Sequence, residues 1–114
     1  MSIDYYATRS NQREQCLEIV RGTDSSLPLL NRDEVREALL EWVPFLESEG
    51  PSGLFQLQWQ VESYIQVTIQ EHYVTINHGT SVGDRLLKTL EAILETLEGQ
   101  GLIIFDPQAN SFLE

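Results

Sequence analysis

The sequence predicts an α+β fold of two layers, with helices packed on one face of an antiparallel sheet. The main observation is an alternation of apolar and polar side chains from Leu54 to His78, which is typical of strands with one buried and one polar face. Segments at about 31–47 and 82–98 instead place apolar residues at helical spacing. A sheet and helices that each carry one apolar face are expected to pack against each other.

Length and composition favour one domain over residues 1–114, because 41% of the residues are apolar and 22% are charged. The lone cysteine, Cys16, excludes an internal disulfide and fits a reducing compartment. No apolar run approaches the roughly 20 residues that span a bilayer, and the N-terminus lacks a signal-peptide pattern. We therefore expect a cytoplasmic protein.

The alternating stretch predicts a meander of strands at about 54–60, 64–70 and 73–78. Its inward apolar residues up to Ile69 are all odd-numbered, so the phase never breaks between the first two strands. One long bent strand satisfies this pattern, and so does a hairpin with loop 62–64 that pairs Val61 with Ile65 and Trp59 with Val67. We favour the hairpin, because a strand of about 16 residues far exceeds the usual length of about 5–6.

Three helices are predicted, at about 11–21, 31–47 and 82–98. Each starts with a capping pair, which is Asn11 with Glu14, Asn31 with Glu34, and Ser81 with Asp84. A strand over 16–20 is the alternative to the first helix. The second helix places Trp42 on its buried stripe, and Pro44 should kink or end it near Val43, with a further turn at 45–49. Trp42 and Trp59 are both expected in the core.

Three further segments read as strands or turns. Residues 102–105 are wholly apolar and predict a short strand, central in the sheet. Residues 3–7 alternate weakly and predict a short edge strand or a disordered lead-in. Asp106 to Asn110 should form a turn, after which Phe112 and Leu113 can dock as a last strand.

The sequence contains no motif for nucleotide binding, acyl transfer or zinc hydrolysis. His72 and His78 lie at the ends of one predicted strand, roughly 20 Å apart, so they cannot share a metal ion. They are expected to be partly exposed, and Cys16 to be buried and inert. We predict no catalytic residue, no metal and no cofactor.

The net charge of −11 argues against nucleic acid and anionic membranes as partners. It is compatible with a basic protein partner, including a nuclease, although acidity also serves plain solubility. Several acids sit where they oppose a helix macrodipole, at the predicted ends of the second and third helices. They form a candidate interaction surface, together with polar residues of the sheet: Glu47, Glu49, Glu91, Glu95, Glu98, Gln56, Gln58 and Gln66.

The segment GLIIFDPQ, residues 101–108, follows a helix with a strand and Asp-Pro-Gln. This ending resembles that of small uncharacterised bacterial proteins, some of which are immunity- or antitoxin-like. The resemblance covers about the last third of the chain and assigns no residue a role. It implies a bacterial binding protein.

Three functions remain open from the sequence. The first is an acidic protein-binding or regulatory module, in the manner of an immunity protein. The second is a self-associating structural domain, a homo-oligomer formed through the Gln-rich sheet face or the edge near 54–60. The third is a small ligand-binding or enzymatic domain with a cleft near His78, Asp84 and Arg85.

Overall fold

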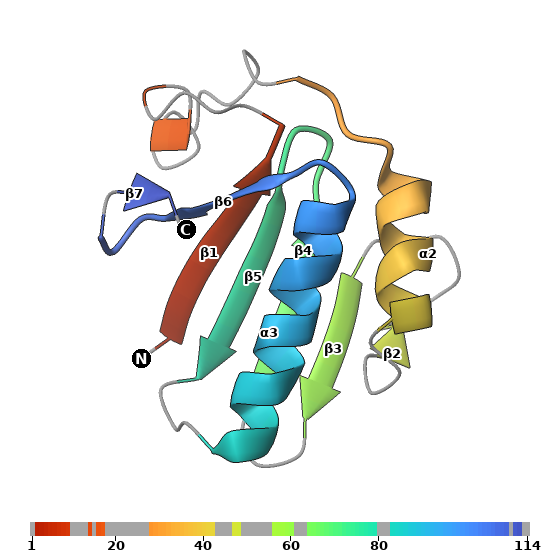
Figure 1. Ribbon diagram of the computed structural model, residues 1–114, viewed down its shortest axis with the longest axis vertical. Helices are drawn as coiled ribbons and strands as arrows, with labels where there is room; N and C mark the ends of the chain where they lie inside the picture. The colour runs from red at the N-terminus through yellow and green to blue at the C-terminus, as the bar shows by residue number, and fades with distance from the viewer. Residues whose placement is uncertain are drawn as a thin grey trace.

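The computed structural model describes residues 2–9, 14, 16–17, 28–42, 47–48, 56–60, 64–79, 83–109 and 111–112. This part of the chain forms an antiparallel sheet with helices α2 (Arg32–Trp42) and α3 (Asp84–Gly99) on one face (Figure 1). The helices pack against each other, and both contact the sheet at β4 (Tyr64–Ile69). The predicted α+β fold is confirmed. Among the described residues, no helix is long and apolar enough to cross a membrane.

The sheet has seven strands among the described residues, in the order β2-β3-β4-β5-β1-β6-β7. All neighbours pair antiparallel. The remaining strands are β1 (Ser2–Thr8), β2 (Glu47–Ser48), β3 (Gln56–Gln60), β5 (Val74–Gly79), β6 (Ile103–Asp106) and β7 (Ser111–Phe112). Strands β3, β4 and β5 are the predicted meander, and β6 and β7 are the predicted C-terminal strands. The predicted central position of the strand at 102–105 is wrong, because β6 lies next to the terminal strand β7.

The hairpin between β3 and β4 is confirmed, but its register differs from the predicted one. Trp59 pairs with Ile65, and Gln60 pairs with Tyr64, so residues 61–63 lie between the last paired positions. The predicted loop was 62–64, which would pair Trp59 with Val67. Both registers match odd-numbered residues with odd-numbered residues. Alternation therefore fixes the face of each side chain and leaves a two-residue shift undecided.

Strand β1 is not the edge strand or lead-in that its weak alternation suggested. It lies inside the sheet, where Ser2–Ala7 pair with β5 and Tyr6–Thr8 pair with β6 (Figure 1). At Asp4, on the side of β1 where β6 no longer pairs, the side chain of Gln108 takes the place of a neighbouring strand. With its amide oriented to suit its neighbours, Gln108 donates to Asp4 O at 2.9 Å and accepts from Asp4 N at 3.2 Å.

The core lies between the sheet and the two helices. Alternate residues of β4 and β5 are buried, as the sequence predicted, and they meet the apolar stripes of α2 and α3. Leucine, isoleucine and valine dominate this layer, which includes Leu39, Leu57, Ile65, Val67, Val74, Ile76, Leu86, Ile93, Leu97 and Ile104. Phe105 and Cys16 are buried outside this cluster.

Helix α2 begins as predicted and is shorter than predicted. The backbone N–H of Glu34 donates to Asn31 Oδ1 at 3.3 Å, and the Asn31 amide donates to Glu34 Oε2 at 3.2 Å. The predicted helix ran to 47, but α2 spans Arg32–Trp42 and Glu47–Ser48 pair with β3 as a strand. Pro44, which cannot continue a helix, accounts for this early change.

The first predicted helix falls largely outside the described residues. Glu14, Cys16 and Leu17 are helical, with Cys16 buried and Leu17 half-buried. The rest of 11–21 lies outside the described part, and so do Leu113 and Ser81.

Helix α3 begins later than predicted and ends in a defined motif. Its N-cap is Gly83, which has an extended backbone and no capping side chain, so the predicted Ser81 cap is wrong. At the other end the N–H of Leu102 donates to Leu97 O, and that of Gly101 donates to Glu98 O. These two bonds define a Schellman motif, with Gly101 at φ 82° as its left-handed residue.

Alanine at the two glycines of this turn should change stability in opposite directions. A Cβ at either Gly99 or Gly101 meets no atom within 4 Å, so backbone conformation alone decides the effect. Gly101→Ala should lower the free energy of unfolding by about 1–2 kcal/mol, because left-handed backbone disfavours a side chain. Gly99→Ala should raise it by about 0.5 kcal/mol through helix propensity. Urea denaturation of both variants measures this, and equal effects would refute the assigned conformations.

Candidate functional site

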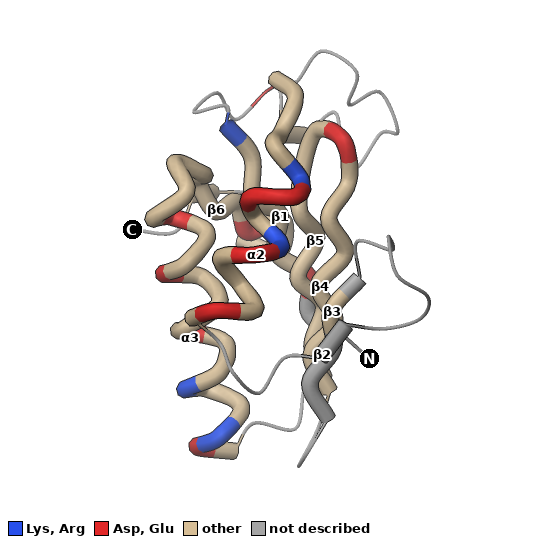
Figure 2. Tube along the Cα trace, turned by 90° about the vertical axis from the view of Figure 1, so that its right-hand side faces the viewer, with Lys and Arg blue, Asp and Glu red and all other residues tan. Residues whose placement is uncertain are grey.

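The charged side chains of the described chain gather on the helical layer. Figure 2 shows acidic and basic positions along α2 and α3, while the strands carry few. The exposed acids of the helices are Asp33, Glu34, Glu37, Glu41, Asp84, Glu91, Glu95 and Glu98. Residues 89–99 of α3 contain three of these acids and no lysine or arginine. The helical layer therefore presents a negative surface, strongest toward the C-terminal half of α3.

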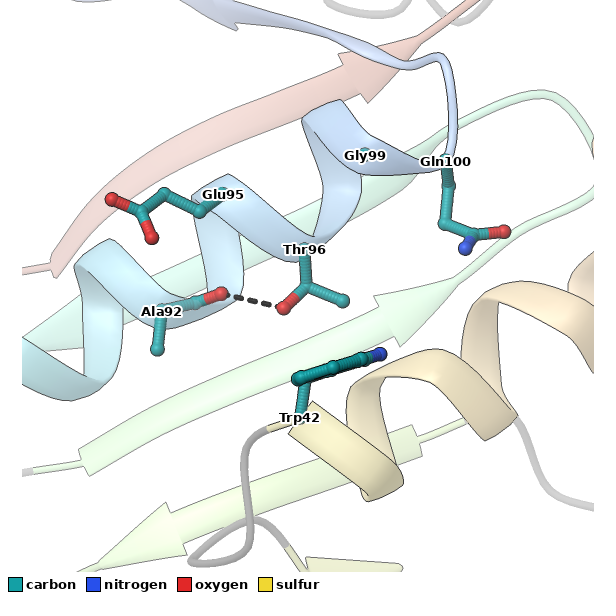
Figure 3. A pocket seen from close by; sticks show the side chains of 6 residues that line it. All are labelled: Trp42, Ala92, Glu95, Thr96, Gly99 and Gln100. Atoms are coloured by element: carbon teal, nitrogen blue, oxygen red, sulfur yellow. Dashed lines mark hydrogen bonds between the residues drawn. The ribbon is translucent and has the colours of Figure 1, made fainter.

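A groove lies on this surface between the end of α2 and the second half of α3. Its volume is about 410 Å³ and it is largely open, lined by Trp42, Ala92, Glu95, Thr96, Gly99 and Gln100. In Figure 3 the indole of Trp42 lies opposite α3, and Ala92 and Thr96 point toward its side, whereas the carboxylate of Glu95 points away from the indole. We call these six residues the Trp42 groove.

Trp42 is 69% exposed, so the prediction that it lies in the core is wrong. It does follow Val35, Ala38 and Leu39 on the inward stripe of α2. The residues of α3 that line the groove beside it are small, however, and they leave the space open. A residue on the inward stripe of a helix is buried only where the opposing surface also has side chains large enough to cover it.

The lining of the groove is rich in hydrogen-bond acceptors. The Thr96 hydroxyl donates to Ala92 O at 2.7 Å, which commits its proton and leaves its oxygen able to accept. Glu95 adds a carboxylate, and Gln100 adds an amide oxygen. The C-terminal end of α3 contributes the negative pole of its macrodipole, with no basic residue in the last turn. The groove is therefore suited to a cationic group.

Three of the sequence-predicted interaction residues lie at or near this groove. Glu91, Glu95 and Glu98 are all exposed on α3, and Glu95 lines the groove. Glu47 is in β2 and not at a helix end, and its side chain lies outside the described part, as does Glu49. Trp42, Thr96 and Gly99 were missed. The signal in the sequence was a row of small residues on α3, Ala92, Thr96 and Gly99, close to the truncated end of α2.

The sheet face opposite the helices is polar over β4, β5 and β1. Register aligns Gln58, Gln66, Asn77 and Asp4 in a row across four strands, and Gln56, Thr68, Thr75 and Tyr6 in the next. Gln66 and Thr68 are half-buried, whereas the side chains of Gln56, Gln58 and Trp59 lie outside the described part. Asn77 donates its amide to Asp4 Oδ1. The predicted Gln-rich row thus continues onto β5 and β1.

Aromatic side chains flank this polar face. The rings of Tyr6 and Tyr73 meet edge to face at 5.9 Å, and those of Phe105 and Phe112 at 5.5 Å. Burial, and to a lesser degree the charge of Asp4, raises the pKa of Tyr6. Tyr64 is 39% exposed.

The suggested cleft at His78, Asp84 and Arg85 has no geometric support. Asp84 and Arg85 are exposed, but His78 is buried, contrary to its predicted partial exposure. His78 stacks on Tyr5 at 5.8 Å, and its Nδ1 lies 2.8 Å from Gly79 O. His72 is half-buried. Among the described residues, no group of three or more His, Cys, Asp or Glu side chains could hold a metal ion.

Comparison with family models, with curated proteins and with solved structures finds no match for this chain.

Cys16 is fully buried, as the sequence predicted, and its sulfur lies 3.7 Å from Thr8 Oγ1. Burial raises the pKa of the thiol, while the contact with Thr8 lowers it to a smaller extent. The thiolate is the reactive form of cysteine. A thiol that is both buried and harder to ionise is chemically protected in the folded protein.

A thiol reagent should test this protection. At about pH 8, near the ordinary thiol pKa, folded protein should react with an aromatic disulfide at least about tenfold more slowly than unfolded protein. The rate should rise as pH climbs through the raised pKa. Thr8→Val, which removes the contact that lowers the pKa, should slow the reaction further. Equal rates in folded and unfolded protein would contradict the assigned burial.

Proposed function

We propose that this protein is an acidic binding module that regulates a basic protein partner. The single observation that carries the proposal is an exposed tryptophan on an open groove, set in a surface whose nearby charges are negative. Exposed aromatic side chains are enriched at protein interfaces, where they supply contact area at low entropic cost. Trp42 provides such an anchor, and the acids of α3 provide attraction over a longer range.

The charge distribution supports a basic partner over other macromolecules. Acids such as Glu91, Glu95 and Glu98 repel phosphate groups, so nucleic acid and anionic lipid are poor candidates. Complementary charge mainly raises association rate and specificity. The resemblance of the C-terminal segment to immunity-like bacterial proteins adds one concrete partner class, a basic nuclease held inactive. A sequence with a single cysteine, and so without an internal disulfide, fits a reducing compartment such as the bacterial cytoplasm.

Loss of charge beside the groove should weaken binding to a cationic probe. A short oligo-lysine peptide should bind wild-type protein at low ionic strength, with affinity that falls steeply as salt approaches about 0.15 M. Glu91→Gln and Glu95→Gln should each weaken binding about twofold, the range of exposed charge pairs. Isothermal titration calorimetry over a salt series measures both effects.

Asp84→Asn is the matched control for these variants. It removes the same charge from the same helix, about 16 Å along α3 from Glu95, and it should leave affinity nearly unchanged. Salt-independent binding would contradict the proposal, and so would equal losses in all three variants.

Self-association through the open sheet face is a second candidate, favoured by one observation. The described residues of β4, β5 and β1 that face away from the helices carry one charged group, Asp4, whose carboxylate accepts a hydrogen bond from Asn77. Two copies with a net charge of −11 repel each other least where their surfaces are neutral. This face allows such an approach.

A charge at the centre of that face should prevent association. Thr75 is half-buried and lies between Thr68 and Tyr6 in register. If the wild-type protein dimerises, Thr75→Glu should shift it to monomer, since a symmetric interface would place two new like charges together. Leu87→Glu adds the same charge at an exposed position of α3 and should have no effect. Sedimentation equilibrium measures the oligomeric state of each variant. A wild-type protein that is monomeric at every concentration would contradict self-association.

A further inference from the structure

We infer that the Trp42 groove receives one arginine side chain of the basic partner, stacked on the indole of Trp42. This inference rests on the proposed function, because it names the group through which the partner is held. It is narrower than that function, since an acidic surface can attract a basic protein without any such site.

The shape of the groove favours a flat group. One wall is the planar indole, and the opposing α3 surface consists of the small residues Ala92, Thr96 and Gly99 (Figure 3). Its volume of about 410 Å³ is near the lower end of ligand sites, which span about 300–1,000 Å³. A slot between an aromatic face and small side chains suits a planar side chain with a slim stem.

The acceptor atoms among the lining residues suit a group that donates hydrogen bonds. The carboxylate of Glu95, the Thr96 hydroxyl oxygen and the Gln100 amide oxygen are all acceptors. A guanidinium is planar, carries five N–H donors and no acceptor, and stacks on aromatic rings. It can lie on the indole with its N–H groups toward the Thr96 hydroxyl oxygen, while the charge of Glu95 adds attraction from the margin of the groove.

Other side chains fit these atoms less well. Lysine matches the charge, but its ammonium is a compact, strongly hydrated point charge that cannot stack. A leucine or phenylalanine would cover the indole and would also remove water from Glu95 without pairing it, which costs free energy. An acidic side chain would meet the carboxylate of Glu95 and the negative end of α3. Arginine satisfies the aromatic wall and the acceptors together.

The test compares oligo-arginine and oligo-lysine peptides of equal length, so that total charge is constant. Wild-type protein should bind oligo-arginine about two- to fivefold more tightly, the range expected for an exposed cation–aromatic contact. Oligo-arginine should also change the fluorescence of Trp42. Trp42→Ala should abolish the preference for arginine and leave the salt-dependent binding of oligo-lysine.

Two substitutions at Gly99 separate the groove from the charge. Gly99 lines the groove, and a Cβ there meets nothing within 4 Å, so both variants should fold. Gly99→Met extends a long side chain from the groove wall without changing any charge, and it should remove the arginine preference. Gly99→Ala is the matched control and should keep it.

The outcomes distinguish this inference from the function on which it rests. Equal affinity for both peptides, or a preference that survives both Trp42→Ala and Gly99→Met, overturns the arginine site. If binding is still weakened by Glu95→Gln and by salt, the acidic binding module stands without it. If neither peptide binds at low ionic strength, both are wrong.

Discussion

The fold depends on the insertion of β1 between β5 and β6. Pairing with β5 joins the start of the chain to the meander, and pairing with β6 joins it to the C-terminal strands. Without β1, the sheet would divide into β2-β3-β4-β5 and β6-β7. The two-stranded β6-β7 part would be only marginally stable by itself. Helix α3, which contacts both β4 and β6, would have no continuous surface to cover.

The geometry of the helical layer follows from where its helices end. Helix α2 ends at Trp42, close to Pro44, and α3 continues past it to the Schellman turn at Gly101. The last residue of α2 therefore faces the second half of α3 across a gap. This helix end places Trp42 opposite the small residues Ala92 and Thr96, which leave it exposed. The residues that end α2 and α3 thus determine where the groove lies.

The sequence predicted periodic features well and long-range features poorly. Alternation found the buried faces of β4 and β5, including Val67 and Ile76, and the capping pair located the start of α2 at Asn31. The sequence pattern could not place β1 in the sheet, because a strand of mixed residues such as Asp4 and Tyr5 carries little periodic signal and its partners lie far along the chain.

The sequence pattern also gave the wrong burial for Trp42, because helical spacing predicts which side of the helix a residue is on and does not predict what lies opposite. The acids of α3 were predicted because each charge can be read from a single position in the sequence. The groove was not predicted, because it forms only where α2 and α3 meet in the fold.

The position of β1 also has a consequence for synthesis of the chain. Its neighbours β5 and β6, and the Gln108 amide that bonds to Asp4, emerge from the ribosome long after β1 itself. Until then both edges of the strand offer unpaired N–H and C=O groups, the usual template for pairing between molecules. Sequence-distant pairing of this kind slows folding. Among the strands of this sheet, β1 therefore waits longest for its pairing partners during synthesis.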